Sequence, residues 1–233
     1  MRTDLFCAPR PARCPAPTGP PTRLQILGER CSGTNFVAEL LRRNLGLALT
    51  EEIGFKHWFV SEGRAVPADV LVIGVERDAA DWVRSLHRQP WHAHPSLRAL
   101  SVDEFARAEW HCVWDDARFG IGPDHRLWGT EMMHERDPAT GERFADPLAM
   151  RHAKHGNWGR LIARAPHGAW LRYEEVRARP REAVERIARA CAVPVREAFD
   201  PVTTYKGQAG RPFSPRRYAP LDRETLAHVA QYA

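Results

Sequence analysis

The chain has 233 residues, of which 43% are hydrophobic, enough to bury one substantial core and too few to favour a second full domain. Its net charge is +5, but 31 of its 34 basic residues are arginines scattered among the acids, so no basic stripe for nucleic acid is indicated. No apolar run reaches the length of a transmembrane helix, and the first residues lack the apolar core of a signal peptide.

The first residues and the cysteines bear on domain organisation and location. Residues 1–22 contain six prolines and few large apolar side chains, so we expect a proline-rich, poorly ordered leader followed by a single domain over 23–233. The five cysteines include no CxxC pair, and their odd number argues against a complete disulfide framework. We therefore expect a reducing, cytoplasmic setting.

The stretch from Leu24 to Asn44 predicts a strand, a tight loop and a helix. Apolar residues run to Gly28, four residues intervene before Gly33, and apolar side chains then recur with helical spacing. A loop of this kind gathers backbone N–H groups and the positive end of a helix at one point, which favours binding of an anion.

The rest of the chain alternates between strand-like and helical segments. We expect strands over 51–60, 70–75 and 169–173, and helices over 79–87, 101–119, 147–165, 181–192 and 222–232. The stretch 120–147 is rich in turn residues and has no assigned element. The alternation predicts an α/β protein with a three-layer, P-loop-like fold in which helices flank a mainly parallel central sheet.

Several chemically active residues follow the predicted strands. In an open parallel sheet, ligands bind beyond the carboxyl ends of the strands. The first strand ends in the glycine loop, the second ends with Lys56 and His57, the third ends at Arg77, and the fourth ends at Tyr173. We therefore expect an anion loop, a cation, a base and an aromatic ring at one edge of the sheet.

The glycine spacing of the loop is that of the phosphate-binding pattern GxxxxGK[ST]. Thr34 and Asn35, however, stand where that pattern has its lysine and its magnesium-binding hydroxyl. A P-loop kinase or nucleotide hydrolase is thus an alternative that the spacing favours and these two residues oppose. A non-catalytic basic module for polyanions is a further alternative, and the scattered arginines weaken it.

Five short motifs resemble, in the same order, those of the sulfotransferases that use 3′-phosphoadenosine 5′-phosphosulfate. They span most of residues 24–211: the loop RCSGTNF at 30–36, the pair Lys56–His57, the segment from Arg77 to Ser85, YEEV at 173–176 and KGQAG at 206–210.

This resemblance implies sulfuryl transfer to a hydroxyl or amine by in-line displacement. It assigns the 5′-phosphosulfate to Arg30, Cys31, Ser32, Gly33, Thr34 and Asn35. It assigns the 3′-phosphate to Arg77, Ser85, Lys206 and Gly207, and it places Tyr173 near the adenine. Under this scheme His57 is the catalytic base, Lys56 stabilises the charge on the bridging or sulfuryl oxygens, and no metal is required.

Two features of the site stay open at the level of sequence. Cys31 stands where many family members have a lysine, so we expect Arg30 or Lys56 to supply the missing positive charge. Glu29, Glu52, Glu131 and His134 are alternatives to His57 as the base.

The acceptor is expected to be a carbohydrate or another small molecule, with no nucleic acid partner. The segments expected to cover it are 89–99 and 119–147, in which Trp91 and Trp128 are candidates for stacking on a sugar or aromatic ring. The sequence indicates no particular oligomeric state.

Overall fold

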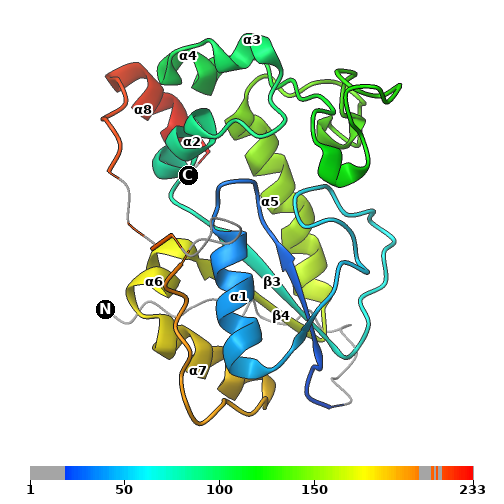
Figure 1. Cartoon of the computed structure of the whole chain (residues 1–233), viewed down its shortest axis with the longest axis vertical. Coiled ribbons are helices and arrows are strands. Elements are labelled where there is room, and N and C mark those ends of the chain that lie inside the picture. Colours follow the sequence, from blue (N-terminus) through cyan, green and yellow to red (C-terminus); the bar gives the residue numbers. More distant parts are fainter. Residues whose placement is uncertain (1–18, 205–210, 213, 215–216, 233) are drawn as a thin grey trace. The chain divides into compact units, whose positions relative to one another are not determined.

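The computed structural model describes residues 19–204, 211–212, 214 and 217–232, and it shows an α/β protein built on a four-stranded parallel sheet (Figure 1). The strand order is β2-β1-β3-β4, with strands β1 (Arg23–Leu27), β2 (Ala48–Leu49), β3 (Val70–Glu76) and β4 (His167–Arg172). In the register of the two central strands, Leu24 pairs with Leu71 and Ile26 pairs with Ile73. The α/β class and the parallel sheet are therefore confirmed.

One face of the sheet is covered by helices α1 (Thr34–Leu45), α6 (Tyr173–Ala178) and α7 (Pro180–Cys191). Successive strand side chains point to opposite faces, so Leu24 and Ile26 of β1 and Ile73 of β3 share this core with apolar residues of α1 and α7. The α1 helix ends at Gly46, which has a left-handed φ of 67° and donates its N–H to Arg42 O.

The other face of the sheet packs against the second half of α5 (Pro147–Arg164). Leu27, Val70 and Val72 point to this side and meet Trp158 and Ile162 of the helix. Both faces of β1 and β3 are thus buried, which explains their almost continuous apolar sequences and gives the fold its three layers.

The chain divides into two compact units. The first comprises Met1–Asp78 and Gly156–Arg217 and contains the sheet, and the second comprises Ala79–His155 and Tyr218–Ala233. The second unit contains the helical elements α2 (Ala79–Arg88), α3 (Pro95–Arg98), α4 (Val102–Arg107), η1 (Ala117–Phe119), η2 (Met133–Glu135), α8 (Arg223–Ala230) and the start of α5.

The second unit contains a buried ion pair. Lys154 Nζ donates to Glu135 Oε1 at 2.8 Å, and the indole N–H of Trp110 donates to Glu135 Oε2 at 3.2 Å. Only 1% of each charged side chain is exposed. Removing either partner would break this ion pair in a site closed to water, which is destabilising.

Two expected elements differ from the structure. The strand expected over 51–60 is wrong, because β2 is confined to Ala48–Leu49 and the segment after it turns at Gly54. The helix expected over 101–119 ends at Arg107, although the capping box of Ser101 and Glu104 that opens it is present. Beyond it, Val113 pairs with Glu131, a contact distant in sequence that local periodicity does not reveal. Among the described residues no helix has the length and apolar character needed to cross a membrane.

Candidate functional site

The candidate site is the loop between β1 and α1, which lies in the first unit. Gly33 is the N-cap of α1 with φ 94°, and it provides no side-chain acceptor for the helix. The first N–H groups of a helix have no intrahelical carbonyl to bind, so they face the loop together with the positive end of the helix dipole. Cys31 also has a left-handed φ, of 65°, so left-handed backbone flanks Ser32 on both sides. This arrangement is a backbone cradle suited to an anion.

The cradle rests on an aromatic ring. A Cβ atom added at Gly33 would lie 2.2 Å from Cδ2 of Tyr173, so the ring packs directly against this glycine. The Arg77 guanidinium lies 5.3 Å from the centre of the same ring, and its Nη1 donates to Cys31 O at 3.0 Å. Tyr173 therefore packs against the loop at Gly33, and Arg77 binds its backbone at Cys31.

Lys56 brings a positive charge to the start of α1. Its Nζ donates to Asn35 Oδ1 at 2.7 Å, although the two residues are 21 positions apart in the sequence. Asn35 is exposed and lies in the first turn of the helix, whereas Arg30 has only 6% of its surface exposed. Lys56 therefore places its charge at the exposed helix start, and Arg30 is buried.

His57 is bonded to the first residue of the loop, Gly28. Its Nδ1 lies 2.6 Å from Gly28 O, and the adjacent backbone bond runs from Gly28 N to Lys56 O at 3.0 Å. A carbonyl oxygen can only accept a hydrogen bond, so the proton of the neutral imidazole is on Nδ1. Nε2 then carries the lone pair, as a general base requires.

Two other residues of the loop point into it. Ser32 is fully buried, and its hydroxyl donates to Glu29 O at 2.7 Å. Thr34 is 4% exposed, and its methyl group would lie 2.7 Å from a Cβ added at Gly28. These side chains shape the loop, so the groups that it presents to a ligand come mainly from its backbone and from Lys56 and His57.

Among the other predicted residues, Glu29 belongs to this loop, and the rest come from other segments. Ser85 lies on α2, in the second unit, and is half-buried. Lys206 and Gly207 lie outside the described residues. Among the alternative bases, Glu131 and His134 belong to the second unit, and Glu29 is 1% exposed.

One residue that positions the site was missed at the level of sequence. Glu174, the second residue of the YEEV motif, accepts a hydrogen bond from Asp78 N at 3.1 Å. It therefore joins the start of α6 to the chain immediately after Arg77. An acid in the first turn of a helix was the available signal, since that position favours negative charge.

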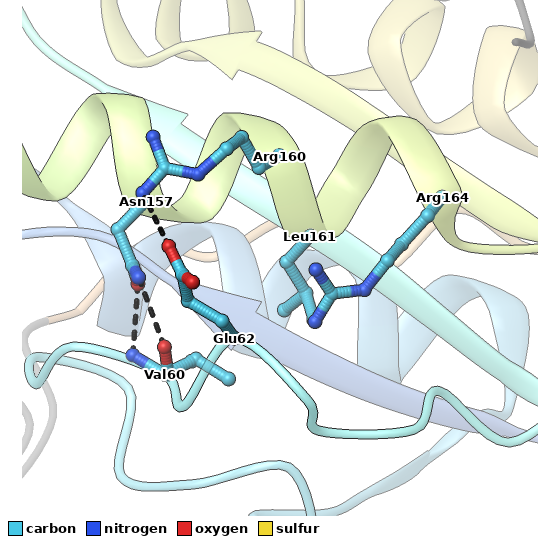
Figure 2. Close-up of a pocket in the computed structure, with 6 residues that line it drawn as sticks. All are labelled: Val60, Glu62, Asn157, Arg160, Leu161 and Arg164. Carbon is cyan, nitrogen blue, oxygen red and sulfur yellow. Dashed lines mark hydrogen bonds and ion pairs between the residues drawn. The ribbon is translucent and has the colours of Figure 1, made fainter.

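A pocket lies beside the segment that follows His57 (Figure 2). Its lining comes from that segment and from α5: Val60, Glu62, Asn157, Arg160, Leu161 and Arg164. Arg160 Nη2 and Glu62 Oε1 are 3.6 Å apart on exposed side chains, and a pair of this kind contributes little to stability. The predicted ligand-binding residues do not line this pocket.

Comparison with known proteins adds no family to this geometry. No family model matches the chain, and a search of curated proteins gave no match. Within the described part of the chain, no three His, Cys, Asp or Glu side chains are grouped so that they could hold a metal ion. The function is therefore argued from the loop and its neighbours.

Proposed function

We propose that the protein is a sulfotransferase that moves a sulfuryl group from 3′-phosphoadenosine 5′-phosphosulfate to a hydroxyl or amine of a small molecule or carbohydrate. The observation that carries this proposal is the convergence of Lys56 and His57 on one anion cradle, through contacts of 2.7 Å to Asn35 and 2.6 Å to Gly28. The reaction needs a cation near the phosphosulfate and an imidazole whose Nε2 is free of a proton and can accept one, both beside a helix N-terminus.

The chemistry follows from these groups. His57 Nε2 takes the proton from the acceptor hydroxyl, the acceptor oxygen forms a bond to sulfur, and the bond from sulfur to the phosphate oxygen breaks. The products are the sulfated acceptor and adenosine 3′,5′-bisphosphate. Lys56 and the first N–H groups of α1 stabilise the negative charge that grows on the departing phosphate oxygen.

Binding of the 3′-phosphate by Arg77, Ser85, Lys206 and Gly207 belongs to the same proposal. Arg77 has a role in the loop already, because it donates to Cys31 O with Nη1. A guanidinium presents its N–H donors as a planar fork that suits a phosphate, which is why Arg77 is included in the proposal.

A P-loop kinase or nucleotide hydrolase is the rival that the glycine spacing favours. Lys56 bears on it, because a lysine from another segment stands near the position where the P-loop has its own. Asn35 opposes it, since its side chain binds that lysine and offers no hydroxyl to magnesium.

The deciding measurement is thermal unfolding with adenosine 3′,5′-bisphosphate and, separately, with ATP and magnesium. A ligand that binds the native state raises the unfolding midpoint. At a concentration 100 times its Kd, it adds about 2.7 kcal/mol to the free energy of unfolding. The proposal expects stabilisation by the bisphosphate and a loss of that effect in Lys56→Met. Stabilisation by ATP and magnesium alone would overturn it in favour of the rival.

A further inference from the structure

The segment that carries Lys56 and His57 is attached to helix α5 by side chains. The Asn157 amide makes two bonds with Val60, accepting from its N–H at 2.8 Å and donating to its carbonyl at 2.9 Å. The next residue of α5, Trp158, donates its indole N–H to Trp58 O at 3.0 Å. Figure 2 shows the Asn157 side chain directed at the backbone of Val60.

The two bonds from Asn157 satisfy the backbone of Val60 as a neighbouring strand would. Val60 lies in an irregular segment, yet both of its backbone polar groups are bonded, as they would be in a sheet. The side-chain amide of Asn157 has the donor and acceptor of a peptide group, and only 7% of the residue is exposed. Its two bonds therefore fix the backbone of Val60 in a buried position, where unpaired polar groups are costly.

The same short segment is held at its other end by the anion loop. Gly28 donates to Lys56 O and accepts from His57 Nδ1, so only two residues lie between His57, bonded to the loop, and Val60, bonded to Asn157. A chain this short, held at both ends, has little freedom to shift. The placement of the imidazole thus depends on both anchors.

We propose that Asn157 is a positioning residue for the site, one that fixes Lys56 and His57 through the backbone of Val60. This inference rests on the proposed function, because it gives Asn157 a part in sulfuryl transfer without contact to the reacting atoms. Displacements of about 1 Å at a reacting group can cost about 100-fold in rate, so an anchor three residues away is sufficient to matter.

The test compares Asn157→Ala with Ile162→Ala in the full chain. Ile162 is on the same helix, 3% exposed, and packs into the core under the sheet, so its truncation also destabilises the first unit. Its side chain belongs to the same apolar cluster as Val60 but makes no hydrogen bond to it, so the comparison separates lost packing from the loss of the two amide bonds. Ile162→Val is the milder control if the alanine variant does not fold.

The first measurement is the ¹⁵N spectrum of the His57 ring, assigned with His57→Gln. In the wild type we expect the tautomer protonated at Nδ1, and in Asn157→Ala a mixture of tautomers. Asn157→Asp keeps the acceptor for Val60 N–H and loses the donor, so it should lie between the two. Both Ile162 variants should retain the wild-type signals. An unchanged His57 ring in Asn157→Ala would overturn the proposal.

The second measurement is the Kd of adenosine 3′,5′-bisphosphate by calorimetry. We expect Asn157→Ala to weaken binding about tenfold through Lys56, and the Ile162 control to stay within twofold of the wild type. Equal weakening in both variants would assign Asn157 a merely structural role. If the wild type itself does not bind the bisphosphate, the proposed function fails, and the His57 spectrum still decides whether Asn157 positions the segment.

Discussion

The contact between Gly33 and Tyr173 gives the sharpest prediction about the anion loop. In Gly33→Ala the new Cβ would lie 2.2 Å from the Tyr173 ring, at a residue whose φ is 94°. The left-handed backbone costs an alanine about 1–2 kcal/mol, and forcing an extra carbon into a packed site adds about 1–3 kcal/mol. We therefore expect the free energy of unfolding to fall by about 2–5 kcal/mol.

The matched control is Gly46→Ala, at the other end of the same helix. Gly46 also has a left-handed φ, of 67°, but a Cβ there would meet nothing within 4 Å. This variant should lose only the backbone part, about 1–2 kcal/mol. Urea unfolding of both proteins measures the difference, and calorimetry with adenosine 3′,5′-bisphosphate shows whether Gly33→Ala alone loses binding. Equal destabilisation by the two substitutions would refute the close approach of Tyr173 to the loop.

Three further predictions concern charged groups. Lys56→Met should weaken binding of adenosine 3′,5′-bisphosphate at least tenfold, measured by calorimetry. Arg30 is buried, so the main effect of Arg30→Met should be a lower free energy of unfolding, measured in urea. Hydrogen bonds from Arg136, and next from Arg143, lower the pKa of Glu131 to about 2. The stability that Glu131 contributes is therefore lost as pH falls from about 4.5 towards 2. Glu131→Gln should reduce the fall in the free energy of unfolding over this pH range, measured by urea unfolding. Burial, and next the charge of Arg143, lowers the pKa of His111, so the native state resists protonation of this side chain. Stability should therefore fall as pH drops below about 6.5, the pKa of a free histidine. His111→Gln should remove that loss, measured by thermal unfolding between about pH 7 and 5.

Contradicting results are equally specific. Wild-type affinity in Lys56→Met would remove the cation from the proposed site. An unchanged acid profile in Glu131→Gln, or an unchanged fall in stability below pH 6.5 in His111→Gln, would mean that other groups dominate the pH dependence.

The local pattern of the sequence predicted the central elements correctly. The apolar run before Gly28 and the one over 70–75 are the strands β1 and β3, and the helical spacing after Gly33 is α1. These elements are decided by neighbouring residues, because a strand buried on both faces is apolar at most positions and a helix that packs on a core is apolar at every third or fourth. The glycine spacing likewise predicted a tight loop at the right place.

The expectation that Lys56 and His57 lie near the loop was reached through a strand that is absent. A parallel strand over 51–60 would have brought them to the edge of the sheet, whereas the structure reaches the same loop with an irregular segment bonded to Gly28. The burial of Arg30 could not be read from the sequence either, since an arginine in a loop is usually exposed.

The sequence by itself determined the parallel α/β core and the glycine loop, because both depend on the order of residues a few positions apart. Only the tertiary structure decided which side chains serve that loop. Asn35 receives Lys56 from 21 residues away, and Asn157 holds Val60 from 97 residues away. Such contacts leave no periodic trace in the sequence, because they depend on where two separately folded elements meet and on the need to satisfy the polar groups buried between them.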